Sequence, residues 1–240
     1  VAELISIFLR MGKRHVNTPM VGRTHMQPAM PSSVALWATA HAESLLLDLK
    51  ALQQVFEQND SCPLGSAAGY GVPVGIDRQL VSDLLGFEEP THNVLYASNS
   101  RGKIEAAILG SMSQVMITVS RIAQDLMLYT MPEFNYFSLA PQYCTGSSIM
   151  PNKNNPDVME LIRAKTAGVL ADAQRVSGII ASSPSGYNRD IQEAKEPFMN
   201  GLKTTADTVK IMAKCIGSIT VNKQSLIAGF DSGVFATDYA

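Results

Sequence analysis

Apolar residues recur at helical spacing in three long stretches of the chain. The clearest lies between residues 100 and 130, with steps of three or four residues: Ile104, Ile108, Met112, Val115, Val119, Ile122, Leu126 and Tyr129. Residues 32–57 contain neither glycine nor proline and show helical spacing at Leu36, Ala40, Leu47, Ala51 and Val55. A third run extends from Asp157 to about Ala181. This periodicity predicts three long helices with apolar faces.

Further helices are expected around these three. Residues 1–16 carry apolar side chains at helical spacing, and Asp77 is a typical N-cap for a short helix that Gly86 ends. Another helix is expected to end near Cys215, and a last short one covers residues 222–228. Period-two alternation is scarce and no Asn-Gly turn occurs, so the expected fold class is all-α, a bundle of long helices.

Four segments rich in glycine, proline and small polar residues are expected to be loops: 17–28, 58–75, 146–156 and 182–197. The long apolar faces need partner helices of similar length, and one chain supplies only a few of these. Association of several chains around a shared helical core satisfies this need.

Composition narrows the class of protein. The chain is 46% apolar and carries a net charge of −2, which offers no basic surface for nucleic acid. No segment has the pattern of a membrane span or a secretory signal, and the three distant cysteines are expected to be reduced thiols, so a cytoplasmic protein without membrane contact is expected. The four histidines lack metal-ligand spacing, so no metal or other cofactor is expected.

The loop at residues 146–156 combines groups that bind anions. It contains the hydroxyls of Ser147 and Ser148 and the ammonium group of Lys153, and it leads into a helix that starts near Asp157. Backbone N–H groups at a helix N-terminus attract negative charge. A polar linker without function is the alternative interpretation.

The same loop is similar to a known signature. Its residues, Gly-Ser-Ser-Ile-Met-Pro-Asn-Lys-Asn-Asn-Pro, resemble the pattern Gly-Ser-Ser-x-Met-Pro-x-Lys-x-Asn-Pro of the fumarase/aspartase superfamily, also called the argininosuccinate lyase family. These enzymes eliminate an amine or water from a succinyl group and release fumarate, and their central domain is a bundle of long helices. The resemblance implies that Ser147 is the catalytic serine and that Lys153 and Asn155 contact the substrate or intermediate. A free hydroxyl is too weak a base, so backbone N–H groups and Lys153 are expected to stabilise the Ser147 alkoxide.

A second region, Thr24-His25-Met26-Gln27, matches the family's Thr-His-x-Gln. The family pairs this histidine with a glutamate seven positions after the signature lysine, which is Glu160 here. The resemblance therefore implies that Thr24 binds substrate and that His25 and Glu160 are catalytic. A carboxylate raises the pKa of a neighbouring histidine, which can then protonate a departing nitrogen or activate water. Alone, His25 would be interpreted as an exposed loop residue and Glu160 as a solvated acid of the first helical turn.

A third region, residues 184–196, resembles the argininosuccinate lyase string Pro-Ser-x-Tyr-Asn-x-Asp-x-Gln-Glu-x-Lys-Glu. In that enzyme the tyrosine, glutamine and lysine hold the amino-acid end of the substrate. Tyr187, Gln192 and Lys195 occupy these positions and are expected to bind substrate. Without the resemblance, the segment would be interpreted as a charged stretch at the start of a helix.

The resemblance has two departures. Gly22-Arg23 precedes Thr24, where argininosuccinate lyases commonly have Pro-Gly-Tyr. Ser100 and Gly102 flank Arg101, where acidic residues are usual.

The reaction that the resemblance implies is β-elimination of argininosuccinate to fumarate and arginine. Two alternatives stay open: another fumarate-releasing lyase, aspartase-like or acting on an aminopolycarboxylate, and a non-catalytic structural relative of the delta-crystallin type.

The resemblance covers nearly the whole chain, whereas family members are longer. Residues 1–217 are expected to form the central helical domain and residues 218–240 the start of a C-terminal helical domain. The chain begins with valine, so a processed product or a piece of a longer enzyme is expected. The family implies a homotetramer whose active sites each draw residues from three subunits, with a succinyl adduct as the small-molecule substrate.

Overall fold

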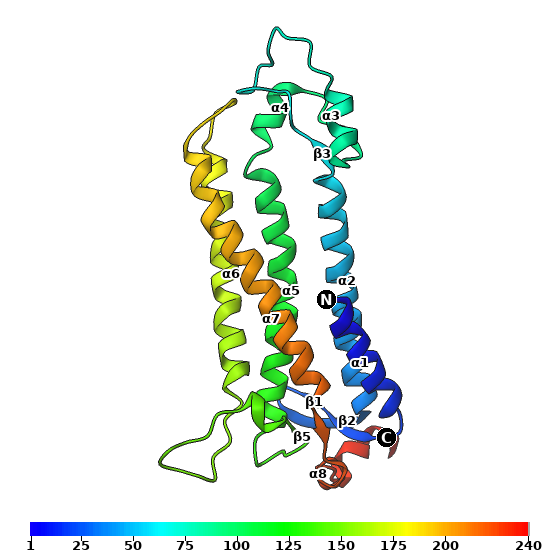
Figure 1. The fold of residues 1–240 in the computed structure, drawn as a ribbon. Helices are drawn as coiled ribbons and strands as arrows, with labels where there is room; N and C mark the ends of the chain where they lie inside the picture. Colours follow the sequence, from blue (N-terminus) through cyan, green and yellow to red (C-terminus); the bar gives the residue numbers. More distant parts are fainter. Residues whose placement is uncertain (240) are drawn as a thin grey trace. The chain divides into compact units, whose positions relative to one another are not determined.

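The computed structural model describes residues 1–239, and its elements are mostly helices (Figure 1). The α-helices are α1 (Ala2–Arg14), α2 (Val34–Gln58), α3 (Arg78–Leu85), α4 (Val94–Asn99), α5 (Lys103–Tyr129), α6 (Asp157–Ala181), α7 (Lys195–Gly217), α8 (Lys223–Ala228) and α9 (Ala236–Tyr239). The 3-10 helices are η1 (Pro141–Tyr143), η2 (Asp190–Ala194) and η3 (Ser232–Phe235). The short strands are β1 (Pro19–Thr24), β2 (Gln27–Ser33), β3 (Ser61–Cys62), β4 (Glu89–Pro90), β5 (Phe137–Ser138) and β6 (Thr220–Val221). The predicted long-helix architecture is confirmed.

The described residues divide into two compact units. Unit 1 comprises residues 1–47, 116–166 and 206–239, and unit 2 comprises residues 48–115 and 167–205. The boundaries fall within the four longest helices, α2, α5, α6 and α7.

The core of unit 1 is built on the apolar face that the sequence predicts for α5. Val119, Ile122 and Leu126 are fully buried, together with Phe8 of α1 and Met159 of α6. Burial of such side chains contributes about 1.5–3 kcal/mol each to stability, before the entropy of ordering them is subtracted. The second half of α5 is therefore a core helix of this unit.

An aromatic cluster with one partly exposed acid, Asp125, joins α2 to α5 in unit 1. The ring of Trp37 lies 5.9 Å from Phe8, 5.0 Å from Phe137 and 6.2 Å from Tyr129, measured between ring centroids. The indole N–H of Trp37 donates to Asp125 Oδ2 at 2.8 Å, and His41 Nε2 lies 3.1 Å from the same oxygen. These contacts satisfy a carboxylate that lies among apolar rings.

Tyr129 should give unit 1 a measurable alkaline pH dependence. Burial, together with the negative charge of Asp125, raises the pKa of Tyr129 from 10.0 to about 12. Between these values the unfolded chain loses the phenol proton while the folded chain keeps it, so the free energy of unfolding falls as pH rises. Urea denaturation below pH 10 and between pH 10 and 12 should show this fall, and Tyr129→Phe should lessen its slope. An equally steep fall in Tyr129→Phe would contradict the assignment.

α5 is the one described helix that is long and apolar enough to cross a membrane, judged by length and composition. The core helix of a soluble protein meets the same measure. Its residues Met116, Val119 and Ile122 are covered by other parts of the chain, which accounts for their apolar character.

Unit 2 confirms the predicted short helix. Asp77 caps α3 by accepting the backbone N–H of Leu80 at 2.9 Å, and Gly86 ends the helix in the left-handed conformation with φ 77°. The sequence analysis did not identify α4, which Asn93 caps by accepting the N–H groups of Leu95 and Tyr96. A six-residue helix carries too little periodicity to be recognised from its apolar positions.

The start of α5 packs closely against the end of α6 in unit 2. Gly102 has φ +78°, and a methyl group at this residue would overlap Ile180 Cγ2 and lie 3.8 Å from Ile191 Cγ2. Only glycine satisfies both the backbone conformation and the space at residue 102. A separate contact joins α6 to α7, where Arg175 Nη1 donates to Glu196 Oε2 at 3.1 Å.

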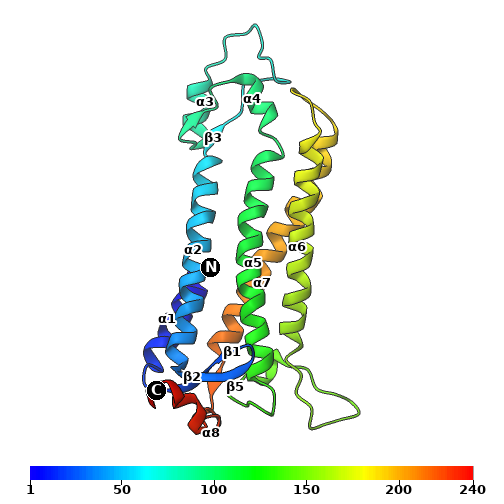
Figure 2. The ribbon, with the colours of Figure 1, turned by 180° about the vertical axis from the view of Figure 1, so that it is seen from behind.

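The prediction of a loop at residues 17–28 is wrong in part, because β1 and β2 form an antiparallel hairpin (Figure 2). Prolines 28 and 31 in β2 obscure the strand pattern, but a two-stranded hairpin has free edges where a missing N–H costs little. The turn residues His25 and Met26 have φ 51° and 64°, a left-handed conformation for which Asn-Gly is the usual sequence signal.

Candidate active site

The β-hairpin presents the predicted histidine at its tip. Thr24 pairs with Gln27 across the turn, so His25 and Met26 form the exposed two-residue connection of unit 1. Histidine tolerates the left-handed region better than most residues, whereas methionine there stores strain. A strained, exposed turn at this position is typical of a functional site.

Arg23 holds this turn against the rest of unit 1. Its Nη1 donates to the carbonyl oxygen of Met26 at 3.1 Å, and its Nη2 lies 3.5 Å from the hydroxyl of Tyr136. The guanidinium carbon lies 4.7 Å from the ring centroid of Phe134. The orientation of the histidine turn is therefore fixed by a cation–π contact and two polar contacts.

The signature loop is closed at its base by a pair of backbone hydrogen bonds. Thr145 N donates to Asn155 O at 2.9 Å, and Asn155 N donates to Thr145 O at 2.8 Å. The loop that leads into α6 extends away from the neighbouring helices of unit 1 in both views (Figures 1 and 2). The ends of the loop are thus defined while its residues are accessible to a ligand.

Ser147 accepts two backbone hydrogen bonds within this loop. Its Oγ receives the N–H of Met150 at 3.1 Å and the N–H of Ile149 at 3.3 Å. Donors aimed at a hydroxyl oxygen stabilise its deprotonated form more than its neutral form. The geometry therefore supplies part of what a serine needs to act as a base.

Of the other predicted residues of unit 1, Thr24, Lys153 and Glu160 are exposed and Asn155 is partly buried. Lys153 lies in the loop and Glu160 in the first turn of α6, on the helix that begins with Asp157. Among the hydrogen bonds and ion pairs of residues 1–239, none joins His25 to Glu160 and none involves the ammonium group of Lys153. The backbone N–H of Lys153 donates to the carbonyl oxygen of Met150 at 3.0 Å. One chain thus presents these groups separately on its surface.

The predicted substrate-binding residues of unit 2 form a partly preassembled group. Gln192 Nε2 donates to the hydroxyl of Tyr187 at 2.8 Å, and Lys195 is the first residue of α7. The guanidinium carbon of Arg101 lies 5.4 Å from the ring centroid of Tyr187. Sequence reasoning noted Arg101 only for its unusual neighbours, and its place beside Tyr187 is a finding of the structure.

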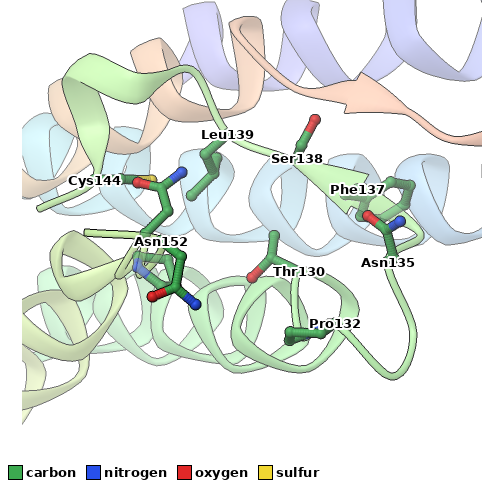
Figure 3. A pocket seen from close by; sticks show the side chains of 10 residues that line it. Thr130, Pro132, Asn135, Phe137, Ser138, Leu139, Cys144 and Asn152 are labelled. Carbon is green, nitrogen blue, oxygen red and sulfur yellow. The ribbon is translucent and has the colours of Figure 1, made fainter. Parts of the chain in front are cut away.

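A polar cavity of about 360 Å³ lies beside the signature loop in unit 1 (Figure 3). Its lining includes the loop residues Asn152, Asn154 and Pro156 and, from the segment after α5, Asn135 and Ser138. Amide groups of this kind can bind the oxygen atoms of a small polar molecule, and the volume lies within the usual range for ligand sites. The asparagines between the fixed positions of the signature were missed because the signature leaves those positions open.

Cys144 also lines this cavity, next to the closed base of the loop. Burial raises the pKa of its thiol, and the negative charge of Asp157 raises this pKa further. The side chain is therefore held as a neutral thiol at neutral pH, which makes it a poor nucleophile. The cavity thus offers polar binding groups rather than a reactive sulfur.

The long-helix fold and the serine loop agree with the match of this chain to a known protein family. Residues 1–171 match the family model described as Lyase, and the chain belongs to this family. It is 38% identical over 226 residues to the argininosuccinate lyase of Parabacteroides distasonis, covering 94% of this chain and 51% of that protein. It is 40% identical over 232 residues to the argininosuccinate lyase of Sorangium cellulosum, covering 97% of this chain and 54% of that protein. The chain thus spans about half the length of the curated relatives it matches.

Solved structures support the fold. The chain superposes on the crystal structure of EDDS lyase in complex with formate with a TM-score of 0.86 and 22% sequence identity, over 93% of this chain and 44% of that one. At this identity the likeness establishes the long-helix architecture, and the chemistry must be argued from the residues.

Proposed function

We propose that the polypeptide carrying this chain is a carbon–nitrogen lyase that converts argininosuccinate to fumarate and arginine. The observation that carries the proposal is the Ser147 hydroxyl, which accepts two backbone N–H groups inside the matched signature loop. The argininosuccinate-lyase-like segment 184–196 and the names of the relatives support this substrate over other succinyl adducts.

In the proposed reaction, Ser147 as alkoxide removes the proton from the carbon next to a substrate carboxylate. The electron pair moves onto that carboxylate as a dianion, which Lys153, Asn155 and the loop N–H groups stabilise. Collapse of the dianion breaks the C–N bond and forms fumarate. His25, paired with Glu160, gives a proton to the departing nitrogen. No cofactor is part of this proposal, because fixed donors supply the acidity.

The same proposal assigns the substrate-binding residues. Thr24 and Asn155 bind the succinyl part, and Tyr187, Gln192 and Lys195 bind the amino-acid end. The hydrogen bond between Gln192 and Tyr187 supports this assignment, because it fixes the phenol before substrate arrives.

We further propose that the protein is a cytoplasmic homotetramer with composite active sites. α2 supports this, because its apolar residues Leu36 and Leu47 are 63% and 70% exposed within the described part of one chain. Shared sites explain why His25 and Glu160 are both exposed and unpaired in one chain. Residues 1–217 then form the central domain and residues 218–240 the start of the next.

A mixing experiment tests the composite site. His25→Asn and Ser147→Ala should each be inactive, but co-expressing both variants should restore activity, because some sites then receive an intact residue from each chain. If each site takes these residues from different chains, half of the histidine positions and half of the serine positions are intact. Roughly one quarter of the sites then recover. Activity that stays at background would place both residues in one chain's site.

The reaction is tested by following fumarate release in the ultraviolet, with argininosuccinate, aspartate, malate and adenylosuccinate as separate substrates. The proposal expects release from argininosuccinate alone. Release from another compound would keep the mechanism and replace the substrate, as the neutral residues flanking Arg101 would allow. Absence of release from all four, by the longest natural polypeptide carrying these residues, would contradict the proposed function and favour a structural role.

A further inference from the structure

The turn that carries Tyr187 is held by Asn99, a residue outside the predicted substrate-binding set. The backbone N–H of Gly186 donates to Asn99 Oδ1 at 2.8 Å. The Asn99 amide group in turn donates to the hydroxyl of Ser185 at 3.4 Å. One side chain at the end of α4 thus binds both residues immediately before Tyr187.

Further contacts support this conformation of the turn. Gly186 is buried with φ +95°, and Asn188 Nδ2 donates to the carbonyl oxygens of Pro184 at 2.7 Å and Gly186 at 3.2 Å. A methyl group at Gly186 would lie 3.5 Å from the hydroxyl of Tyr70. Tyr70, which belongs to the segment 58–75, therefore lies next to this turn.

Asn99 is the last residue of α4, and both ends of this helix are held by hydrogen bonds. Asn93 caps the start of α4, and the hydroxyl of Ser100 donates to the carbonyl oxygen of Ala97 at its end. The next residues are held by the close packing of Gly102 on Ile180. The position of the Asn99 amide is thus set by the packing of unit 2.

Two further contacts hold the side chain of Tyr187 itself. Arg101, two residues after Asn99, lies over its ring, and Gln192 donates to its hydroxyl. The ring is consequently held by Arg101 in the turn between α4 and α5, and its hydroxyl by Gln192 in η2. A flexible turn would lose both contacts, because they require Tyr187 in one place.

We propose that Asn99 is a positioning residue for substrate binding, which orders residues 185–187 so that Tyr187 and Gln192 meet the amino-acid end of the substrate together. This inference rests on the proposed function and adds a residue that the signature strings do not include. Its role is to lower the entropy lost when substrate binds, so it acts on affinity more than on bond breaking.

The test uses Asn99→Ala in the longest natural polypeptide that carries these residues. Loss of both bonds should raise KM for argininosuccinate about tenfold while kcat changes less than about threefold. Hydrogen exchange at the Gly186 amide should accelerate in the same variant. Asn99→Asp keeps an acceptor for Gly186 N–H and should restore KM to within about threefold of the unchanged protein.

Asn200→Ala is the matched control, because Asn200 Nδ2 donates to Asp172 Oδ2 at 2.6 Å elsewhere in unit 2. It should alter stability without raising KM. An unchanged KM in Asn99→Ala, an unchanged Gly186 exchange rate, or an equal rise in Asn200→Ala would overturn the positioning role. No turnover by the unchanged protein would instead overturn the proposed function, and with it the role of Asn99 in binding.

Discussion

Ser147→Ala should lower kcat for fumarate release by about 10³-fold or more while leaving the fold intact. The hydroxyl is the proposed proton acceptor, and its two backbone donors have no substitute acceptor once it is gone. Ser147 is only partly buried in an accessible loop, so its removal costs little folding energy. Stopped-flow or steady-state measurement of fumarate, with circular dichroism as a check on folding, measures the effect.

Ser148→Ala is the matched control for this prediction. Ser148 carries the same hydroxyl one residue later and is exposed in the same loop. Its replacement should reduce kcat by less than about tenfold, since it acts at most as one extra donor to the intermediate. A larger loss in Ser148→Ala than in Ser147→Ala would reverse the roles of the two serines.

Gly102→Ala should lower the free energy of unfolding by about 3 kcal/mol. The new methyl group meets Ile180 Cγ2 in a packed region, and φ +78° is unfavourable for any residue with a Cβ. The two costs add because relief of the contact requires movement of the backbone that sets φ. Urea denaturation monitored by circular dichroism gives the difference directly.

Gly110→Ala provides the comparison within the same helix. Nothing lies within 4 Å of a methyl group at Gly110, which is in the interior of α5. Alanine there should raise the free energy of unfolding by about 0.5–1 kcal/mol through helix propensity. Equal stability changes in the two variants would contradict the packing described at Gly102.

Periodicity predicted the long helices because burial and helical geometry act on the same residues. The steps through Val119, Ile122 and Leu126 correspond to a face of α5 that is fully buried. In α2, however, the periodic residues Leu36 and Leu47 are exposed. The buried side is formed by other residues: Val34, Ala38, Ala42 and Leu45. Periodicity identifies a helix, but it does not tell which apolar side faces its own chain.

Elements held together by contacts distant in sequence could not be predicted. The β1–β2 hairpin has proline in its strands and methionine in a left-handed turn, and Arg23 secures it through Tyr136, far along the chain. Local signals for a strand or a turn were therefore absent. α4 escaped detection for the related reason that its six residues are fixed by an N-cap and by packing.

For the candidate site, sequence and structure contribute different information. The signature strings identify Ser147, His25 and Tyr187 as candidates, but their roles stay predictions until they are tested. The strings contain no trace of the backbone donors to Ser147 or of the contact between Asn99 and Gly186, because these depend on loop conformation. Arg101 illustrates the limit: its neighbours differ from the family pattern, and only the structure shows its place over the candidate residue Tyr187.

The donors to Ser147 come from the main chain of Ile149 and Met150, and this has an evolutionary consequence. Every amino acid except proline carries the same N–H, so side-chain replacement at residue 149 leaves the donor in place. Ile149 is 88% exposed, and the family signature leaves this position open. Genetic drift can therefore alter the surface of the loop while the candidate serine keeps its electrostatic environment. Substrate preference and basic chemistry can consequently evolve at different rates within one short loop.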